Sequence, residues 1–488
     1  MSDPSGSSSA LDVDEDETAP EILAVVDDEF TTQSIQDAGL RVLADLEGQD
    51  DDDDEEDDKD GEHDDDVEDV IMDVDDVDGD VDGDGETFTP DRDDATAILG
   101  DNAHTASVFA VDVHPVATAQ MRVAATGGGD DVAVLWQVPT SRATDGTPAR
   151  GNPTARLTSH ADSISMVRYN TAGTLLATAG LDGKLCVFTV EGEHVATCEG
   201  PGGGCEWLTW HPRGDVLLCG CEDFTAWMFN AKDGLCMNVF SGHSNAVGCG
   251  KFTRDGKRIL TGASDTSVRL WDPRTAACLS TLQGGATSAG AFHEGDVLCC
   301  DDALPADVPS DAGVEPTRLC ISGGAEGLVY LSDVSRGSSF GAMTGGHENG
   351  YSVEVVAFPP TPVGAATAPA PRFAASAGTD GKLVVWDVER TSEWTIKRHP
   401  HAITCMQWHP SHEGLVLTAG ADAVIRLWDL RAPTEAAALA AAPAAADVPL
   451  REYKGHTKAI LDLRVSQDGG IFATASDDHT ARIYELAL

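Results

Sequence analysis

The sequence predicts an all-β fold, an eight-bladed β-propeller that follows a long, disordered acidic tail. Two observations support this prediction. Beyond about residue 95, short alternating apolar runs are separated by Gly, Asp and Asn, which is the pattern of strands and turns. One such strand-and-turn unit then recurs with a fixed internal spacing, which is typical of folds built from repeats.

Residues 1–94 form the predicted tail. They hold 40 acidic residues against three basic ones, with too few large apolar side chains to offset the entropy of ordering the chain. Residues 95–488 are also acidic, with a net charge of −16. Both parts repel nucleic acid and anionic membranes and attract basic partners. We therefore expect no direct nucleic-acid or membrane ligand.

The repeated unit is clearest between His243 and Trp271. A single unit of this kind cannot bury both of its faces, whereas neighbours arranged radially can, so we expect a closed ring. The order of its parts resembles a WD repeat, also called WD40. After His243 come a strand at 247–252, a turn at 253–256, a strand at 258–261, a tight turn at Asp265 and a strand at 268–271.

Eight copies of this unit keep the same register, which predicts eight blades. In each copy an acid lies six residues before the end of the third strand. The pairs are Asp130 with Trp136, Asp182 with Phe188, Asp223 with Phe229, Asp265 with Trp271, Glu326 with Ser332, Asp380 with Trp386, Asp422 with Trp428, and Asp478 with Tyr484. Four residues before each acid lies a hydroxyl, except at Cys219; the others are Thr126, Thr178, Thr261, Ser322, Ser376, Thr418 and Thr474.

A histidine precedes six of these copies. The turn acid can accept backbone N–H groups and hold this histidine, which reaches the strand hydroxyl, which reaches the indole N–H. We interpret the set as a structural network, because a catalytic pair would occur once. The third and fifth copies, near Pro201 and Gln283, lack the histidine and the tryptophan, so partial networks are expected there. The six histidines are His104, His160, His243, His347, His399 and His456.

Closure of the ring needs strands from both ends of the repeat region. The last repeat stops at residues 484–488 without a fourth strand, and Thr96 to Leu99 precedes the first histidine. We predict that residues 96–99 complete the last blade. Four insertions are expected to be loops, at 142–154, 301–317, 359–371 and 432–449.

No known catalytic motif is present, so the sequence predicts a protein that is not an enzyme and has no cofactor. GxxxxGK[ST], GxSxG and HExxH are all absent. The 12 cysteines show no CxxC pair or zinc-finger spacing and are interpreted as reduced core residues, with no metal site. Residues 80–85 match half of an EF-hand loop, but no flanking helices can be read.

Neither a secretory signal nor an apolar stretch of about 18 residues is found. The expected location is cytoplasmic, with the nucleus as an alternative, and the expected state is a monomer.

Several short runs in this order resemble the angio-associated migratory cell protein family. They are Ser107-Val108-Phe109, the segment 205–213 with its Glu206-Trp207 pair, the Asp-Gly-Lys-Arg of 255–258, and Ala459-Ile460-Leu461-Asp462. The resemblance covers about residues 95–486, and an acidic N-terminal tail is also a family trait. It implies an eight-bladed WD40 propeller whose fungal relatives act as a dedicated chaperone of a basic large-subunit ribosomal protein.

This implied function agrees with the charge of the chain. A newly made ribosomal protein is strongly cationic, and an acidic surface can shield it and accelerate the encounter. Two alternatives stay open. Residues 271–274 and 428–431 match the WDxR ending of cullin-4 ligase substrate receptors, which makes Arg274 and Arg431 candidate adaptor contacts. A histone-binding propeller would also attract its partner through an acidic surface and would differ only in the basic protein that it binds.

Partner contacts are predicted on the rim that bears the tight turns. In each repeat, the residues three and five positions after the histidine and the residue before the turn acid are expected to face this rim. Two residues inserted after His347 are not counted, and the third-repeat positions are placed by alignment because its histidine is missing. Acids there would pair with Lys or Arg, and aromatic residues would provide an anchor. The predicted contacts are Phe109, Glu206, Trp207, Glu222, Glu354 and Asp477.

Overall fold

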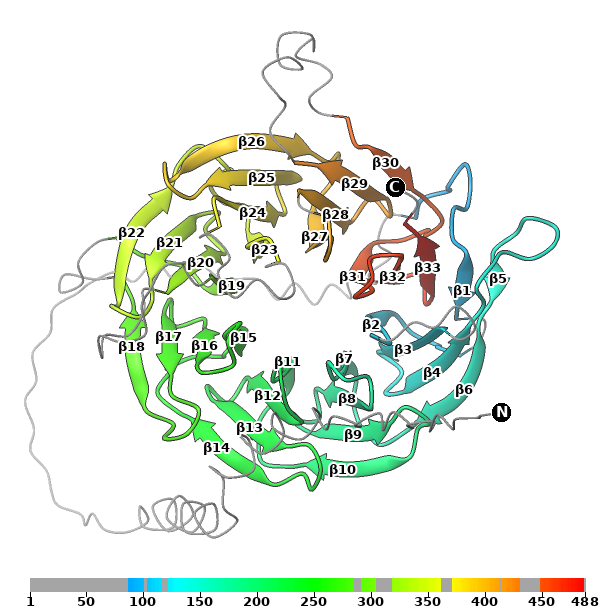
Figure 1. The fold of residues 1–488 in the computed structure, drawn as a ribbon, viewed down its shortest axis with the longest axis horizontal. Coiled ribbons are helices and arrows are strands. Elements are labelled where there is room, and N and C mark those ends of the chain that lie inside the picture. Colours follow the sequence, from blue (N-terminus) through cyan, green and yellow to red (C-terminus); the bar gives the residue numbers. More distant parts are fainter. Residues whose placement is uncertain are drawn as a thin grey trace, which may run out of the picture. The chain divides into compact units, whose positions relative to one another are not determined.

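The fold is a ring of eight β-sheets around a central channel, which confirms the predicted propeller (Figure 1). The computed structural model describes residues 87–100, 103–115, 122–284, 291–303, 318–360, 371–412, 414–430 and 448–486. The predicted tail up to residue 86, with its partial EF-hand match, lies outside these residues. Among the residues described, no helix is long and apolar enough to cross a membrane.

The innermost strand of each blade borders the channel, and each of these strands contacts the next one around the ring. Their inner positions carry small or branched apolar residues because both faces of each sheet are covered by a neighbouring blade. In blade order they are β2 (Val108–Val113), β7 (Ile164–Tyr169), β11 (Cys205–Trp210), β15 (Cys249–Phe252), β19 (Val297–Ala303), β23 (Val353–Ala357), β27 (Ile403–Trp408) and β31 (Ile460–Val465).

The two middle strands of each blade are almost completely buried between neighbouring blades. The second strands are β3 (Arg122–Gly128), β8 (Leu175–Gly180), β12 (Val216–Cys221), β16 (Ile259–Gly262), β20 (Leu319–Gly324), β24 (Phe373–Gly378), β28 (Leu415–Gly420) and β32 (Ile471–Ser476). The third strands are β4 (Ala133–Val138), β9 (Leu185–Thr189), β13 (Ala226–Asn230), β17 (Val268–Trp271), β21 (Val329–Asp333), β25 (Lys382–Asp387), β29 (Ile425–Asp429) and β33 (Ala481–Glu485).

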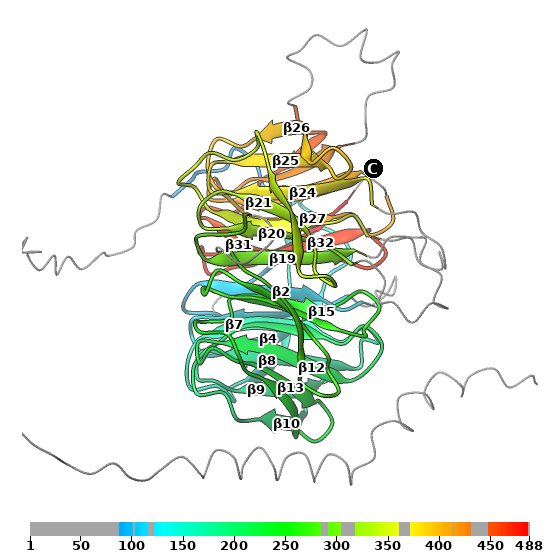
Figure 2. The same ribbon diagram turned by 90° about the vertical axis from the view of Figure 1, so that its left-hand side faces the viewer.

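The outermost strands are the most exposed. Seven of them follow their blade in sequence: β6 (Asn152–Leu157), β10 (His194–Cys198), β14 (Cys236–Phe240), β18 (Cys278–Leu282), β22 (Ser338–Met343), β26 (Ser392–Arg398) and β30 (Arg451–Tyr453). Part of the insertion expected to be a loop at 142–154 is therefore strand. The prediction missed it because β6 alternates weakly in polarity and starts at Asn152. Figure 2 shows the ring edge-on, with β10 and β26 at its outer edge.

The eighth blade is closed by the start of the repeat region, as predicted. β1 (Ala97–Leu99) pairs antiparallel with β33, with Ala97 opposite Ile483. A short strand, β5 (Ala149–Arg150), then pairs parallel with β1 and adds a fifth strand to this blade. β1 therefore joins the two ends of the repeat region, and its other edge is covered by β5, which comes from the insertion in the first blade.

The chain that leads into β1 also contacts the last blade. Phe88 N–H donates to the Thr457 carbonyl over 2.7 Å, and Asp94 N–H donates to the Lys454 carbonyl over 2.8 Å. The Asp93 carboxylate pairs with Arg482 of β33. Contacts with the ring thus begin at least seven residues before residue 95, the start expected from composition.

Candidate protein-binding face

Four side chains of the first blade form one hydrogen-bonded chain. Trp136 Nε1 donates to Thr126 Oγ1 over 2.8 Å, and this hydroxyl lies 2.7 Å from His104 Nε2. His104 Nδ1 lies 2.9 Å from an Asp130 carboxylate oxygen. Because a carboxylate only accepts, Nδ1 carries the proton and Nε2 accepts from the hydroxyl. Burial lowers the pKa of His104, which keeps the ring neutral.

The same arrangement recurs around the ring and holds the loops that form one face of the propeller. His–acid and His–hydroxyl distances in four further blades lie between 2.8 and 3.0 Å. These are His160 with Asp182 and Thr178, His243 with Asp265 and Thr261, His347 with Asp380 and Ser376, and His456 with Asp478 and Thr474. Trp271 and Trp386 donate to Thr261 and Ser376 as Trp136 does to Thr126.

The seventh blade reverses the direction of this chain. Arg426 lies between the two expected partners, 2.9 Å from His399 Nδ1 and 2.6 Å from Asp422. A guanidinium only donates, so Nδ1 of His399 accepts and its Nε2–H points to Thr418, 2.7 Å away. Burial and the charge of Arg426 hold the pKa of His399 well below its usual range.

The fifth blade has a complete His–acid pair, which corrects the prediction that it lacks one. His293 Nδ1 lies 2.5 Å from Glu326, and His293 Nε2 lies 2.8 Å from Ser322. The expected position near Gln283 is wrong because about ten residues are inserted ahead of β19. The signal was present in the sequence, since His293 precedes Val297 by the same four residues that separate His104 from Val108.

The third blade has no histidine at this position, as expected. The N–H of Gly202 still donates to the Asp223 carboxylate over 2.9 Å, as the N–H of Thr105 does to Asp130 in the first blade, but the third blade has no imidazole beside this acid. Trp227 Nε1 donates to Thr225 Oγ1, two residues away, and the Asp223 carboxylate accepts from that same hydroxyl. A local turn network thus replaces the chain that links turn and core in the other blades.

Three positions of every repeat are brought together at one face. In all eight blades the N–H of the residue before the turn acid donates to the carbonyl of the residue three positions after the histidine position, over 2.9 to 3.2 Å. In the sixth blade two inserted residues place this carbonyl five positions after His347. The donors and acceptors are Gly129 and Ser107, Leu181 and Ser163, Glu222 and Gly204, Ser264 and Ala246, Ala325 and Asp296, Thr379 and Ser352, Ala421 and Ala402, and Asp477 and Ala459.

The position five residues after the histidine lies at a bulge near the start of the inner strand. In seven blades the register between the first and second strands shifts there. A bulge re-aims the side chain away from the regular ladder. The bulged residues, with Gly248 at the matching position of the fourth blade, are Phe109, Ser165, Glu206, Leu298, Glu354, Thr404 and Leu461. We call the 24 residues at these three positions the turn face.

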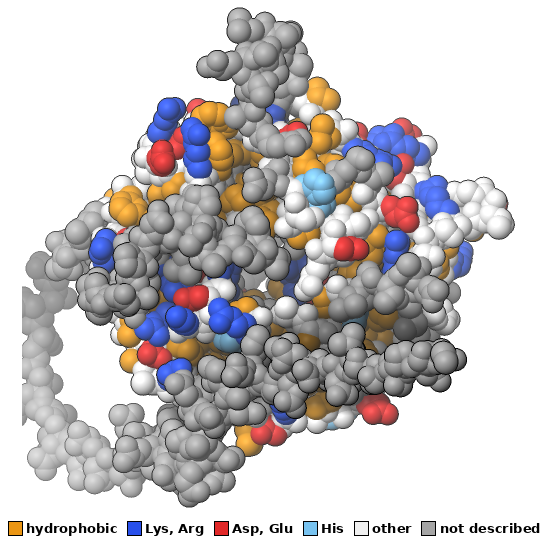
Figure 3. Space-filling model, in the orientation of Figure 1, with side chains coloured by type: hydrophobic (Ala, Val, Ile, Leu, Met, Phe, Trp, Pro, Cys, Tyr) orange, Lys and Arg blue, Asp and Glu red, His pale blue; other side chains and the backbone are white. Residues whose placement is uncertain are grey.

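The turn face holds five acids and no Lys or Arg. Four of the acids are the predicted contacts Glu206, Glu222, Glu354 and Asp477. The fifth, Asp296, was missed because its histidine was misplaced. Basic side chains do occur elsewhere on the ring, where Figure 3 shows them interspersed with acids. The absence of any base among these 24 residues therefore distinguishes them from the rest of the described ring.

Glu206 and Glu222 are two acids that lie on the same blade, the third, of the turn face. Glu222 is exposed and accepts the N–H of Gly204 over 3.3 Å. Burial, and then the charge of Glu222, raises the pKa of Glu206. A cation between the two carboxylates would relieve both effects, because an opposite charge within a few ångströms favours the ionised acid.

Glu354 and Asp477 already have partners within the protein. Ser352 Oγ donates to Glu354 over 2.5 Å, and Ser107 Oγ donates to Asp477. Lys458 Nζ lies 3.9 Å from Asp477. Their carboxylates are partly neutralised or oriented, so the third blade offers the stronger attraction for a basic side chain.

Apolar anchors lie beside these acids, but Trp207 is not one of them. Its side chain is buried, with 6% exposed, and its Nε1 donates to the Val247 carbonyl over 2.6 Å. The correction has a simple cause: Trp207 follows the bulge and turns inward. Phe109 is exposed to 37%, as predicted, and Leu181, before the turn acid of the second blade, is exposed to 42%.

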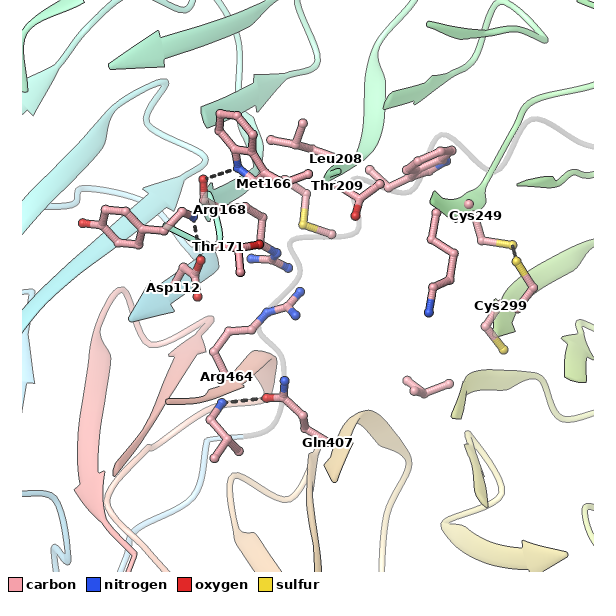
Figure 4. A pocket seen from close by; sticks show the side chains of 18 of the residues that line it. Asp112, Met166, Arg168, Thr171, Leu208, Thr209, Cys249, Cys299, Gln407 and Arg464 are labelled. Carbon is pink, nitrogen blue, oxygen red and sulfur yellow. Dashed lines mark hydrogen bonds between the residues drawn. The ribbon is translucent and has the colours of Figure 1, made fainter. Parts of the chain in front are cut away.

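The channel behind the turn face encloses a cavity of about 560 Å³. Figure 4 shows Arg168 and Arg464 pointing into it from the second and eighth blades. Arg168 lies 3.0 Å from Asp462, whose carboxylate also accepts the N–H of Val111 over 3.1 Å. These contacts tie three neighbouring blades together, so the buried charges of the channel serve ring closure.

Arg274, one of the two WDxR arginines, lies in the turn after β17. Its N–H donates to Asp272 over 2.9 Å. Arg431 falls outside the described residues.

Comparison with known proteins supports the repeat assignment. The model of the family described as "WD domain, G-beta repeat" matches residues 151–189, 192–230, 234–272, 390–429 and 447–485. Human angio-associated migratory cell protein is 29% identical over 399 residues, which cover 81% of this chain and 80% of that protein. An uncharacterized WD repeat-containing protein of Schizosaccharomyces pombe is 26% identical over 80% of this chain and 86% of its own.

Solved structures share the fold. Saccharomyces cerevisiae Sqt1 superposes with a TM-score of 0.62 at 17% identity, covering 81% of this chain and all of that one. Chaetomium thermophilum Sqt1, bound to the N-terminus of the ribosomal protein L10, superposes with a TM-score of 0.62 at 19% identity over the same shares. At this identity the likeness concerns architecture. The chain thus carries WD repeats in an eight-bladed propeller and resembles angio-associated migratory cell protein.

Proposed function

We propose that this propeller is a non-enzymatic chaperone or escort of a basic large-subunit ribosomal protein during ribosome biogenesis. The observation that carries the proposal is the composition of the turn face. Its 24 residues, three from each of the eight repeats, include five acids and no Lys or Arg. A newly made ribosomal protein carries many Lys and Arg residues that need screening before they meet RNA. The proposal places this activity in the cytoplasm or nucleus, with one propeller per cargo.

The arrangement of the third blade supports a specific docking mode. A Lys or Arg of the cargo would lie between Glu206 and Glu222, while an apolar cargo residue would contact Leu181 on the neighbouring second blade or Phe109 on the first blade. Charge-assisted hydrogen bonds provide orientation and a fast encounter, and the apolar contact provides much of the affinity. The similar fold of a propeller bound to the N-terminus of a ribosomal protein supports the same class of cargo.

The test is affinity purification of the protein from its own cells, followed by mass spectrometry. The wild-type chain should recover one basic large-subunit ribosomal protein as its main partner. The variant Glu206→Lys with Glu222→Lys should lose it at least tenfold, because two attractive contacts become repulsive. Binding should also weaken as salt is raised, since the Debye length falls from about 8 Å at physiological ionic strength to about 3 Å at 1 M.

A charge-matched control distinguishes the effect of the turn face on cargo binding from the effect of the net charge of the protein. Glu191 and Glu193 are exposed on the turn between β9 and β10, away from the 24 positions. Changing both to Lys alters net charge equally and should leave cargo recovery unchanged. Equal loss in both variants, or recovery of histones or ligase adaptor subunits as the main partner, would refute the proposal.

A further inference from the structure

Three cysteines of the third blade lie together in the core. Cys205 begins β11, and Cys219 and Cys221 lie two residues apart on β12, so their side chains share one face. The Sγ atoms all lie within 4.8 Å of one another, at 3.5 Å between Cys205 and Cys221 and 3.9 Å between Cys219 and Cys221. All three side chains are fully buried.

Each of the three cysteines departs from what the other seven blades carry at the same repeat position. Where Cys205 lies, the others have a buried Val or Ile; where Cys219 lies, they have a network hydroxyl; where Cys221 lies, they have five Gly, one Ala and one Ser. The repeat positions are unrelated in role, so three independent substitutions converge on one point in space. The seven aliphatic residues are Val108, Ile164, Val247, Val297, Val353, Ile403 and Ile460.

The missing histidine explains how these side chains fit. In other blades the residue at the Cys221 position is packed against the imidazole: a Cβ on Gly180 would lie 2.4 Å from His160 Nδ1, and one on Gly324 would lie 2.5 Å from His293 Nδ1. The third blade has Pro201 at the histidine position, so no imidazole ring fills this space. The Cys221 side chain therefore takes space that the ring occupies elsewhere.

We propose that Cys205, Cys219 and Cys221 form a three-sulfur site for copper(I). Thiolates are soft ligands that favour copper(I) and zinc. An ion held about 2.3 Å from each of three sulfurs sets them about 4 Å apart, close to the observed spacing. Structural zinc almost always takes four ligands, and within the described chain this group supplies three. The number of ligands therefore favours copper(I).

Binding of copper(I) by the three thiols is a ligand exchange. Binding forms copper–sulfur bonds, releases any displaced thiol protons to solvent and changes no oxidation state.

The test is an anaerobic titration of the reduced full-length chain with copper(I), in competition with the chromophoric chelator bicinchoninate. We expect one ion per chain to be taken from the chelator, with a sulfur-to-copper charge-transfer band. The variant Cys205→Val, Cys219→Thr, Cys221→Gly carries residues found at these positions in other blades, and it should lose this ion. If that variant is unfolded by circular dichroism, the single change Cys219→Thr, expected to weaken binding at least tenfold, decides instead.

Two controls use cysteines outside the cluster. Replacing the exposed Cys236 and Cys278 by Ser should leave the titration unchanged. Cys249 and Cys300 form another close pair, with Sγ atoms 3.6 Å apart. The proposal is overturned if the wild-type chain takes no copper from the chelator, if the consensus variant still takes it, or if the ion is lost on changing Cys249 and Cys300 instead.

Discussion

At the scale of residues, we expect the stability of a blade to depend most strongly on the hydroxyl of its hydrogen-bond network. Thr261 bonds both His243 Nε2 and Trp271 Nε1, at 2.8 Å each. Since both groups are buried, losing the hydroxyl leaves two polar groups unpaired, whereas Val fills the same volume. An unsatisfied buried polar group costs about 1–3 kcal/mol.

We therefore predict that Thr261→Val lowers the free energy of unfolding by about 3 kcal/mol. The matched variant is Thr178→Val in the second blade, where the hydroxyl bonds His160 and the third strand ends in Phe188 instead of Trp. It should cost about half as much. Urea unfolding followed by tryptophan fluorescence measures both. Equal losses would show that the indole bond contributes nothing.

The residue scale also shows what the sequence could not reveal. The direction of the His399 chain depends on Arg426, four residues after the turn acid, where the first blade has Val134. Spacing identifies the partners of a network but not which of them donates. Trp207 was likewise placed by sequence distance alone, and the bulge at Glu206 turns it into the core.

At the scale of elements, the eighth blade depends on β1, a strand of three residues. β1 covers the edge of β33 and is itself bonded to β5. Without it, β33 would present unpaired N–H and C=O groups, and an uncovered strand edge is prone to pair with other chains. The contacts of residues 88–94 with the last blade add to this closure.

This predicts different outcomes for two truncations. A chain that starts at Thr87 keeps all of these contacts and should melt within about 2 °C of the full-length protein, which corresponds to a loss of no more than about 1 kcal/mol for a large domain. A chain that starts at Asp101 lacks β1 and should melt at least 5 °C lower and aggregate on heating. Scanning calorimetry with light scattering distinguishes them. Identical melting of the two truncated chains would mean that β1 does not close the ring.

Repeats explain why the fold was predictable from sequence and some details were not. The acid-to-strand-end spacing holds in all eight copies, so blade number, strand order and the closing role of residues 96–99 follow from it. An insertion changes the spacing locally, which is why the histidine of the fifth blade was expected at the wrong position. β5 was missed for another reason, since two residues carry no periodicity.

At the scale of the whole molecule, the placement of charge distinguishes the turn face from the channel. Arg168 and Lys251 line the channel and pair with Asp462 and Asp301 of other blades, so these charges are matched between blades. The turn face has acids without bases at its repeat positions, and its third blade carries Glu206, whose pKa is raised by burial and then by the charge of Glu222. Matched charges stabilise a ring, whereas unmatched charges of one sign attract a partner of the opposite sign.

The measurement that tests this account most directly is site-specific photo-crosslinking in living cells. A benzophenone side chain replaces Phe109 on the turn face or, as a control, Leu279 of β18, which is exposed to 45% on the outer wall. We expect a basic large-subunit ribosomal protein to be captured from position 109 and not from position 279. Capture of that protein equally from both positions, or of histones or ligase adaptors from position 109, would contradict the account.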